Sequence, residues 1–402
     1  MASIEILIPL FAQNWLQETN HTEPVLRIES LLAAHGNALA DPFMGWLFRL
    51  YVHLAHSSVP QLLVLARVAR DANLAFWEAE IRRLEVDGHL IATDRSQTVA
   101  IILGAIERRT ILARLGFGEY DNNPPHFLDV AAHSALALFQ VYGTPQFWAG
   151  RADEPVQGWV AADHDACVPY TPIGVSPDAL MELPSGRLSQ FARGLLAQET
   201  DRLDTIGRKR RIQLAAMLEC IEYGYEAATM ARVANRAGVS TATLYLEYHD
   251  KPALFLDAII LQSKFQVNYL GLRRQGDSAA QFIVSMVYSL AQVLADPGFL
   301  WFHRISMASE ISGAPELVAS TRRTRSHTEG FWYDYFEGLV TGGDIISCDL
   351  PLTLNLLLGA TQRRSVLSMI FFGPDDVSDE EIERLSKAST DFVLRLVGKP
   401  TN

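Results

Sequence analysis

An internal repeat at an offset of 255 residues constrains the fold of this chain more than any other feature. Leu39-Ala40-Asp41-Pro42 returns as Leu294-Ala295-Asp296-Pro297, and the same offset, without a gap, carries Phe76-Trp77 onto Phe331-Trp332. Of the 80 positions from 39 to 118, 26 are identical to their partners, which is not a chance match. Further identical pairs are Trp46 and Trp301, Gly88 and Gly343, Gly104 and Gly359, and Arg108-Arg109 and Arg363-Arg364. We therefore expect one kind of domain to occur twice.

Both copies show the spacing of apolar residues that is typical of helices. In the second copy, apolar residues recur every three or four positions from Leu352 to Leu367. Ser378, with Glu381 three residues later, forms a capping box that opens a last helix from Asp379 to Val397. Sustained alternation with period two is missing from the whole sequence. The patterns predict an all-α fold.

Composition limits the class of protein. The 402 residues are 49% hydrophobic and 20% charged, with both signs mixed, which favours globular domains over disorder. Cys167, Cys220 and Cys348 lie far apart, so they predict neither a disulfide framework nor a cysteine zinc site, and we expect no cofactor. The sequence shows no signal peptide and no apolar run long enough for a membrane span, so we expect a cytoplasmic protein without membrane contact.

Four segments follow from the repeat and from breaks in composition. The first copy occupies residues 1–145, and a linker rich in Pro and Gly, ending in a connecting helix, occupies 146–203. Residues 204–251 form a separate small unit, and the second copy occupies 252–402.

The unit at 204–251 has the pattern of a helix-turn-helix. A first helix is predicted from Arg208 to Tyr223, ended by Gly224, and Thr229 can cap a second helix. Gly238 permits a sharp turn, and Ser240 can cap a third helix. In a helix-turn-helix the second helix of the motif presents its first residues to base edges in the major groove of double-stranded DNA.

This unit closely resembles the TetR/AcrR family of transcriptional regulators. The matching positions are Gly224-Tyr225, Thr229, Val233-Ala234-Asn235-Arg236-Ala237-Gly238-Val239-Ser240, Leu244-Tyr245 and Lys251. The resemblance implies that Thr241, Ala242 and Thr243 read bases, while Ser240, Tyr245 and Lys251 hold phosphates. It also implies helical ligand domains that dimerise through their last two helices, so both copies of the repeat are expected to be effector domains, the second one also serving dimerisation.

The charge of residues 205–251 favours DNA binding, whereas the net charge of the whole chain does not. The whole chain has a formal net charge of −12, whereas residues 205–251 hold seven basic and five acidic residues. Four of the basic residues form a run that begins with Arg208 and Lys209, which we interpret as phosphate contacts. The alternative is a solvated charge run. Together with Thr229, these residues complete the predicted DNA-binding set.

Two residues depart from the family pattern. Glu247 stands where the family usually has His or Tyr, and a carboxylate facing phosphate is repelled. Leu246 replaces a commonly basic position. The repeat also places residue 1 opposite residue 256, so the first copy is expected to lack its own helix-turn-helix. Either that reader was lost or the gene start is placed too late.

The repeated aromatic residues are candidates for an effector site, since ligand pockets are mostly apolar with a few polar groups. In the second copy these candidates for contact with a small apolar or aromatic effector are Trp301, His303, Arg304, Met307, Phe331, Trp332 and Tyr335. The alternative is core packing of large rings and structurally satisfied polar groups. For Arg108-Arg109 and Arg363-Arg364 we expect pairing between helices, and binding of an acidic ligand is the second interpretation.

These observations predict a ligand-responsive transcription regulator, in the first instance a repressor, that reads a DNA operator with one helix-turn-helix. The alternative is a protein-interaction pseudo-dimer whose degenerate reader no longer binds DNA and which modulates other regulators. An enzyme is not expected, because no nucleophile elbow, phosphate loop or zinc-protease motif occurs. For assembly, residues 97–142 packed against 352–397 would give an intrachain pseudo-dimer, and a homodimer is the other arrangement.

Overall fold

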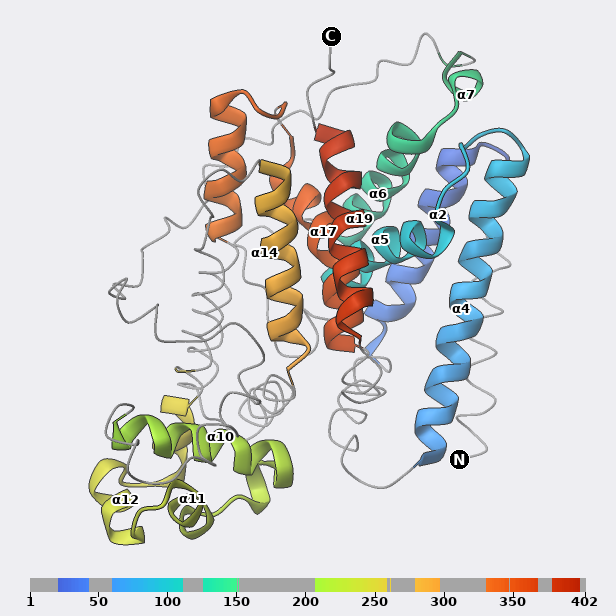
Figure 1. Ribbon diagram of the computed structural model, residues 1–402. Helices are drawn as coiled ribbons and strands as arrows, with labels where there is room; N and C mark the ends of the chain where they lie inside the picture. The colour runs from blue at the N-terminus through green and yellow to red at the C-terminus, as the bar shows by residue number, and fades with distance from the viewer. Residues whose placement is uncertain are drawn as a thin grey trace. The chain divides into compact units, whose positions relative to one another are not determined.

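The computed structural model describes residues 21–42, 60–110, 126–149, 151, 207–258, 261, 279–296, 330–346, 348–367 and 378–397 (Figure 1). Every regular element named in these ranges is a helix, and an isolated bridge joins Leu90 to Gly143. The predicted all-α class is therefore confirmed. Within these ranges no helix is both long and apolar enough to cross a membrane.

The chain divides into two compact units, which we describe separately. The first comprises Met1–Val168, Gln275–Tyr288 and Trp332–Asn402, and the second comprises Pro169–Arg274 and Ser289–Phe331. The first unit thus collects helices from both copies of the repeat, whereas the predicted segments followed the order of the sequence.

Helices of the first copy lie in the first unit and begin at local capping signals. They are α2 (Pro24–Ala40), α4 (Pro60–Val86), α5 (Arg95–Glu107), α6 (Phe127–Tyr142) and the short α7 (Pro145–Ala149). The Glu23 side chain accepts from the first turn of α2, and Asp94 accepts from that of α5. Both caps satisfy backbone N–H groups that a helix leaves unpaired. Apolar side chains of these helices, such as Ile28, Trp77 and Ile102, form the core.

Helices of the second copy repeat this pattern. Residues 330–342 are helical, α17 (Leu350–Gln362) continues into a π-helical turn (Arg363–Leu367), and α19 (Asp379–Val397) ends the described chain. The helix α14 (Ala279–Leu294) is the counterpart of α2 in sequence and extends across the division between the units. Ser378 accepts from the backbone N–H of Glu381, as the predicted capping box requires.

Equivalent residues of the two copies have the same local geometry. Gly88 and Gly343 both have left-handed backbones, with φ of 76° and 78°. Asp94 and Asp349 cap α5 and α17 in the same way. The Ile91 N–H donates to the Tyr142 carbonyl at 2.8 Å, and Ile346 donates to Val397 at 2.8 Å. The sequence repeat is therefore a structural repeat.

The two copies meet where α5 and α17 cross (Figure 1). A Cβ atom on Gly104 of α5 would lie 2.4 Å from the Gly359 carbonyl carbon of α17, and one on Gly359 would lie 2.3 Å from that of Gly104. The two glycines are equivalent in the repeat, so each copy uses the same residue against the other. Such self-matching contacts are typical of a two-fold interface, which here lies within one chain. Helices α6 and α19 pack alongside, and the four helices form a bundle.

Polar contacts across this bundle repeat in pairs but differ in charge. Arg363 donates to the Glu107 carboxylate, and the equivalent Arg108 donates to Gln362, the equivalent of Glu107, at 2.9 Å. Arg108 also donates to Asn355 at 2.7 Å. The expectation that these arginines pair between helices is therefore confirmed, with an acid on one side and two neutral acceptors on the other.

Glu107 is fully buried and is held by a second partner. Its other carboxylate oxygen lies 3.2 Å from Nε2 of His35, which is also buried. Burial alone would raise the pKa of Glu107, but the charge of Arg363 and the contact with His35 hold that pKa below its ordinary value. Glu107 of α5 therefore acts as a buried anion that joins α2 of its own copy to the π-helical turn after α17 in the other copy.

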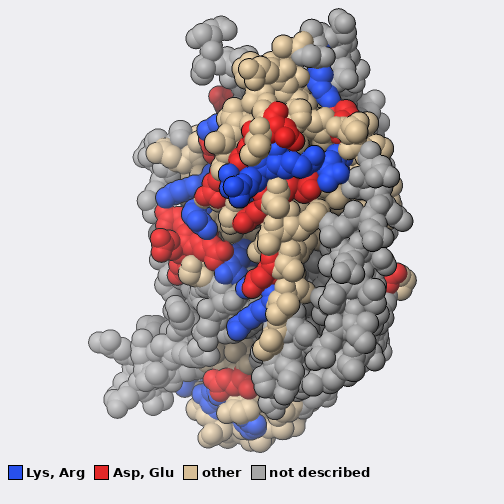
Figure 2. All heavy atoms as spheres, turned by 90° about the vertical axis from the view of Figure 1, so that its right-hand side faces the viewer, with Lys and Arg blue, Asp and Glu red and all other residues tan. Residues whose placement is uncertain are grey.

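The face of the first unit that includes α4 has no single sign of charge. Figure 2 shows acidic and basic side chains interleaved there. Arg83 pairs with Glu80 at 3.1 Å, Arg95 with Glu85 at 2.7 Å, and Arg70 with Asp71 at 3.0 Å. A surface of this kind gives little long-range attraction for a phosphate backbone.

Candidate nucleic-acid interface

The second unit contains the predicted helix-turn-helix. It consists of α10 (Arg208–Ala227), α11 (Met230–Ala237) and α12 (Thr241–Glu247), followed by a helical segment at 251–258. The prediction that Gly224 ends the first helix is wrong, because α10 continues to Ala227 and stops before the cap at Thr229. Glycine weakens a helix interior but does not forbid one, and its backbone here is not left-handed.

Local signals fix the turn and the start of α12. The hydroxyl of Thr229 accepts from the Arg232 N–H and caps α11. Gly238 ends α11 with a φ of 67°, a left-handed conformation that glycine adopts without strain. The hydroxyl of Ser240 accepts from the Thr243 N–H at 3.0 Å and lies 2.8 Å from the Thr243 hydroxyl. These are the caps and the turn that the sequence predicts.

Two buried side chains set the orientation of α12. Leu244 is fully buried and Tyr248, just past the helix, is 5% exposed. The opposite side of the helix consists of exposed residues, and half-buried Thr243 lies between the two sides. The exposed residues are Thr241, Ala242, Tyr245, Leu246 and Glu247. Helix α12 therefore presents its first turn and one face outward, the geometry that a recognition helix needs.

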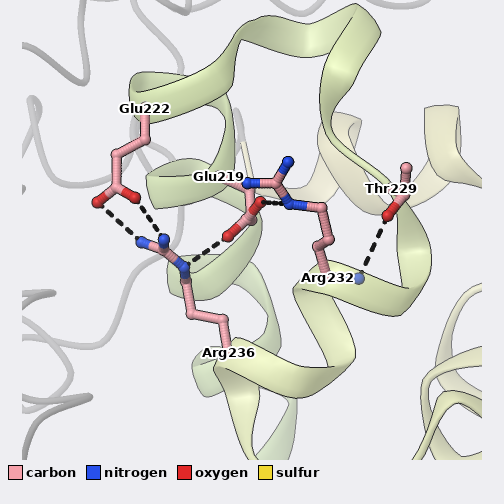
Figure 3. Close-up of polar contacts among 5 residues, drawn as sticks. All are labelled: Glu219, Glu222, Thr229, Arg232 and Arg236. Atoms are coloured by element: carbon pink, nitrogen blue, oxygen red, sulfur yellow. Dashed lines mark hydrogen bonds and ion pairs between the residues drawn. The ribbon is translucent and has the colours of Figure 1, made fainter.

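A buried carboxylate fixes α11 against α10 (Figure 3). Glu219 of α10 is 3% exposed and contacts two arginines of α11, Arg232 at 2.9 Å and Arg236 at 2.7 Å. Arg236 also pairs with Glu222, and this hydrogen bond, together with the charge of Glu219, raises the pKa of Arg236 although burial alone would lower it. Two arginines of the motif are thus engaged inside it.

Glu219→Gln is expected to weaken the motif by about 1–3 kcal/mol, because two arginines would lose their shared counter-charge. Both guanidinium groups are partly exposed, so the effect stays below that of a fully buried pair. Hydrogen exchange of backbone amides in residues 208–258 measures this local opening. Glu222→Gln is the matched control, because its partner Arg236 keeps Glu219 as a counter-charge. If amide exchange became faster by the same factor in both variants, the proposed role of Glu219 would be contradicted.

The predicted phosphate-binding lysines also have structural partners. Lys209 pairs with Asp257 at 2.9 Å, and the Tyr248 hydroxyl donates to Asp257 at 2.7 Å. Burial and then this hydrogen bond raise the pKa of Tyr248. The ammonium of Lys251 lies 4.3 Å from the centre of the Tyr225 ring. Lys209 remains 60% exposed, so its charge can still face a phosphate.

The structure brings most of the predicted DNA-binding residues together. Ser240, Thr241, Ala242, Thr243 and Tyr245 lie at the start and along α12. Arg208 and Lys209 lie in the first turn of α10, Thr229 begins α11, and Lys251 begins the helical segment after α12. Their contacts with DNA stay a prediction.

The predicted effector residues are only partly described. Trp301, His303, Arg304 and Met307 lie outside the described residues. Trp332 is fully buried and lies 6.4 Å from Phe336 between ring centres, whereas Phe331 and Tyr335 are half-buried. Tyr335 lies 4.8 Å from Phe282 of α14. The burial of Trp332 fits a core role, and the effector site stays a prediction.

Sequence reasoning missed the role of Glu219. Its place on the apolar face of α10 gave no sign of a partner, because Arg232 and Arg236 lie on another helix. The one available signal was their spacing of four residues, which puts both on one face of α11.

Comparison with known proteins finds a matching family for the helix-turn-helix part of the second unit. Residues 212–258 match the family described as "Bacterial regulatory proteins, tetR family". A search of curated protein sequences finds no match. Solved structures that resemble the chain include a TetR-family transcriptional regulator from Mesorhizobium loti, at 23% identity and a TM-score of 0.42, covering 50% of this chain and 100% of the other. Another is a TetR-family regulator from Rhodococcus sp., at 20% identity and a TM-score of 0.39, covering 46% and 97%.

Proposed function

We propose that the chain is a ligand-responsive transcription regulator, a repressor, that reads its operator with α12, because residues 212–258 match the tetR family of bacterial regulatory proteins. The observation that carries this proposal is the outward face of α12, whose first turn is capped by Ser240 and held in place by buried Leu244. Side chains at the start of a helix presented in this way reach base edges in the major groove.

Regulation is proposed to work by a shift between two conformations. A small apolar or aromatic molecule bound among the aromatic residues of the second copy, such as Trp332 and Tyr335, would favour one arrangement of the reading helices over another. The change in DNA affinity cannot exceed the difference in ligand affinity between the two arrangements. We propose that the protein works in the cytoplasm.

Thr241→Asp is expected to abolish binding to DNA of any sequence without weakening the fold. A carboxylate at this exposed position would face the phosphates, yet an acid in the first turn favours the helix. Electrophoretic mobility shifts with the full chain and genomic fragments measure the loss. Val68→Asp, on the exposed side of α4, introduces the same charge elsewhere and should leave binding intact. Unchanged binding by Thr241→Asp would mean that α12 does not face DNA.

A second candidate function is a protein-interaction module whose reader no longer binds DNA. It is favoured by exposed Glu247 on α12 and by the pairing of Arg232 and Arg236 with acids rather than with solvent. The same assay separates the two functions, since this module would retain no DNA fragment.

For assembly, we propose that the chain is an intrachain pseudo-dimer. The contact of Gly104 with Gly359 and the paired contacts of Arg108 and Arg363 support this proposal, because equivalent helices of the two copies already face each other. In the part of the chain that the structure describes, the bundle of α5, α6, α17 and α19 already pairs one copy with the other.

Sedimentation velocity is expected to give the mass of one chain, 44.7 kDa, at all concentrations tested. The physical reason is that the pairing surface is filled within the chain at a high effective concentration. A stable species of twice this mass would contradict the intrachain pseudo-dimer.

A further inference from the structure

We propose that α12 recognises thymine, through contact of Ala242 and Leu246 with the C5-methyl groups in the major groove. This inference rests on the proposed function and names the chemistry of the DNA that the same surface selects. It assigns base reading to Leu246, which sequence comparison had treated only as a lost basic residue.

The residue types on α12 exclude the usual polar code. Its sequence, Thr241 to Glu247, contains no Arg or Lys, which pair bidentately with guanine, and no Asn or Gln, which pair bidentately with adenine. The two arginines of α11, Arg232 and Arg236, are already paired with Glu219. Direct reading by α12 is therefore left to hydroxyl groups and to apolar contact.

The apolar residues lie together on the outward face. Ala242 and Leu246 are four residues apart, so they are neighbours on one side of the helix. Leu246 is 88% exposed, and the adjoining Tyr245 is 51% exposed. Their position opposite buried Leu244 continues the surface that begins at the Ser240 cap. In the major groove, the apolar group that such a stripe can meet is the C5-methyl of thymine.

The size of the stripe argues against a protein as its occupant. Ala242, Tyr245 and Leu246 together offer roughly 400 Å², whereas a stable protein interface needs about 800 Å² from each partner. Charged Glu247 adjoins it on one side. The C5-methyl groups of a few thymines in the major groove of DNA match an apolar surface of this size better.

The test removes the methyl groups without altering the protein. The full chain is used to select binding sites from random double-stranded DNA, and each thymine of the selected site is then replaced by deoxyuridine, one at a time. At one or two positions we expect affinity to fall by about three- to fivefold, the effect of losing one buried methyl contact. Thymines outside the protected region serve as the control and should tolerate the replacement.

Leu246→Ala supplies the protein side of the test. This variant should bind the thymine site several-fold more weakly and should lose its sensitivity to deoxyuridine at the position that Leu246 covers. Val86→Ala, at a valine of α4 that is 77% exposed, is the matched control and should change neither property.

The outcomes separate this inference from the proposed function. If no DNA is selected, the proposed function fails and the inference fails with it. If DNA is selected but a duplex with deoxyuridine at every thymine binds equally well, thymine recognition is overturned while the proposed function stands. If Leu246→Ala keeps the full sensitivity to deoxyuridine at every position, the assignment to Leu246 is overturned.

Discussion

Gly104→Ala is expected to destabilise the four-helix bundle by about 3 kcal/mol or more, at the upper end of the effect of overpacking. The new methyl group would lie 2.4 Å from the Gly359 carbonyl carbon and 2.5 Å from the Ala360 nitrogen, and both atoms belong to backbone that cannot rotate away. Relief requires α5 and α17 to separate along their length. Urea unfolding followed by fluorescence of buried Trp77 and Trp332 measures the loss.

The repeat provides both a replicate and a control for this experiment. Gly359→Ala should have a similar effect, because its methyl would lie 2.3 Å from the Gly104 carbonyl carbon. Gly338→Ala, at an exposed position of the helix at 330–342 where the added methyl meets no atom within 4 Å, should instead stabilise the protein by about 0.5–1 kcal/mol through helix propensity. If Gly338→Ala destabilised the protein as much as Gly104→Ala, the close contact of Gly104 with Gly359 would not be the cause of the loss in unfolding free energy.

Glu107→Gln is expected to cost about 2–4 kcal/mol of unfolding free energy, because Arg363 would lose its buried counter-charge. On the other side of the bundle, Arg108 already faces a glutamine, Gln362, but there Asn355 supplies a second acceptor. The position equivalent to Asn355 in the first copy is Ala100, whose side chain has no hydrogen-bond acceptor. Arg363 therefore depends on the charge of Glu107 in a way that Arg108 does not depend on Gln362.

Pseudo-symmetry suggests a rescue for this variant. Adding Ala100→Asn to Glu107→Gln reproduces around Arg363 the arrangement seen around Arg108 and should restore part of the lost stability. Ala100→Asn alone, with Glu107 intact, is the control and should give no gain. A double variant no more stable than Glu107→Gln would contradict the equivalence of the two sides.

The contribution of Glu107 should also depend on pH. Because its pKa is lower in the folded protein than its ordinary value of 4.5, the carboxylate stabilises the fold above that value. This stabilisation is lost as the pH falls through the lowered, folded-state pKa. The difference in unfolding free energy between the natural chain and Glu107→Gln should thus be largest near neutral pH and shrink in acid. A difference that stays constant in acid would mean that Glu107 does not carry the charge of this contact.

Elements whose signals span only a few residues could be predicted from the amino-acid sequence alone. Thr229 and Ser240 cap helices, Gly238 forms the turn, and the helical periods exclude sheets, because each depends on atoms within one turn of the chain. The repeat likewise required no coordinates. These signals were sufficient for the helix-turn-helix and for the all-α class.

Contacts between residues far apart in the sequence could not be predicted and became visible in the three-dimensional arrangement of the helices. Glu219 joins two arginines of another helix, and Gly104 meets its own counterpart Gly359, 255 residues away. The same holds for the exposed face of α12, since the burial of Leu244 and Tyr248 determines which side of the helix remains open. Such contacts depend on how helices cross, and the crossing depends on the packing of whole side-chain surfaces rather than on any short run of residues. For that reason the repeat could suggest that the two copies pair. It could not show that Arg363 meets a buried carboxylate while Arg108 meets two neutral acceptors.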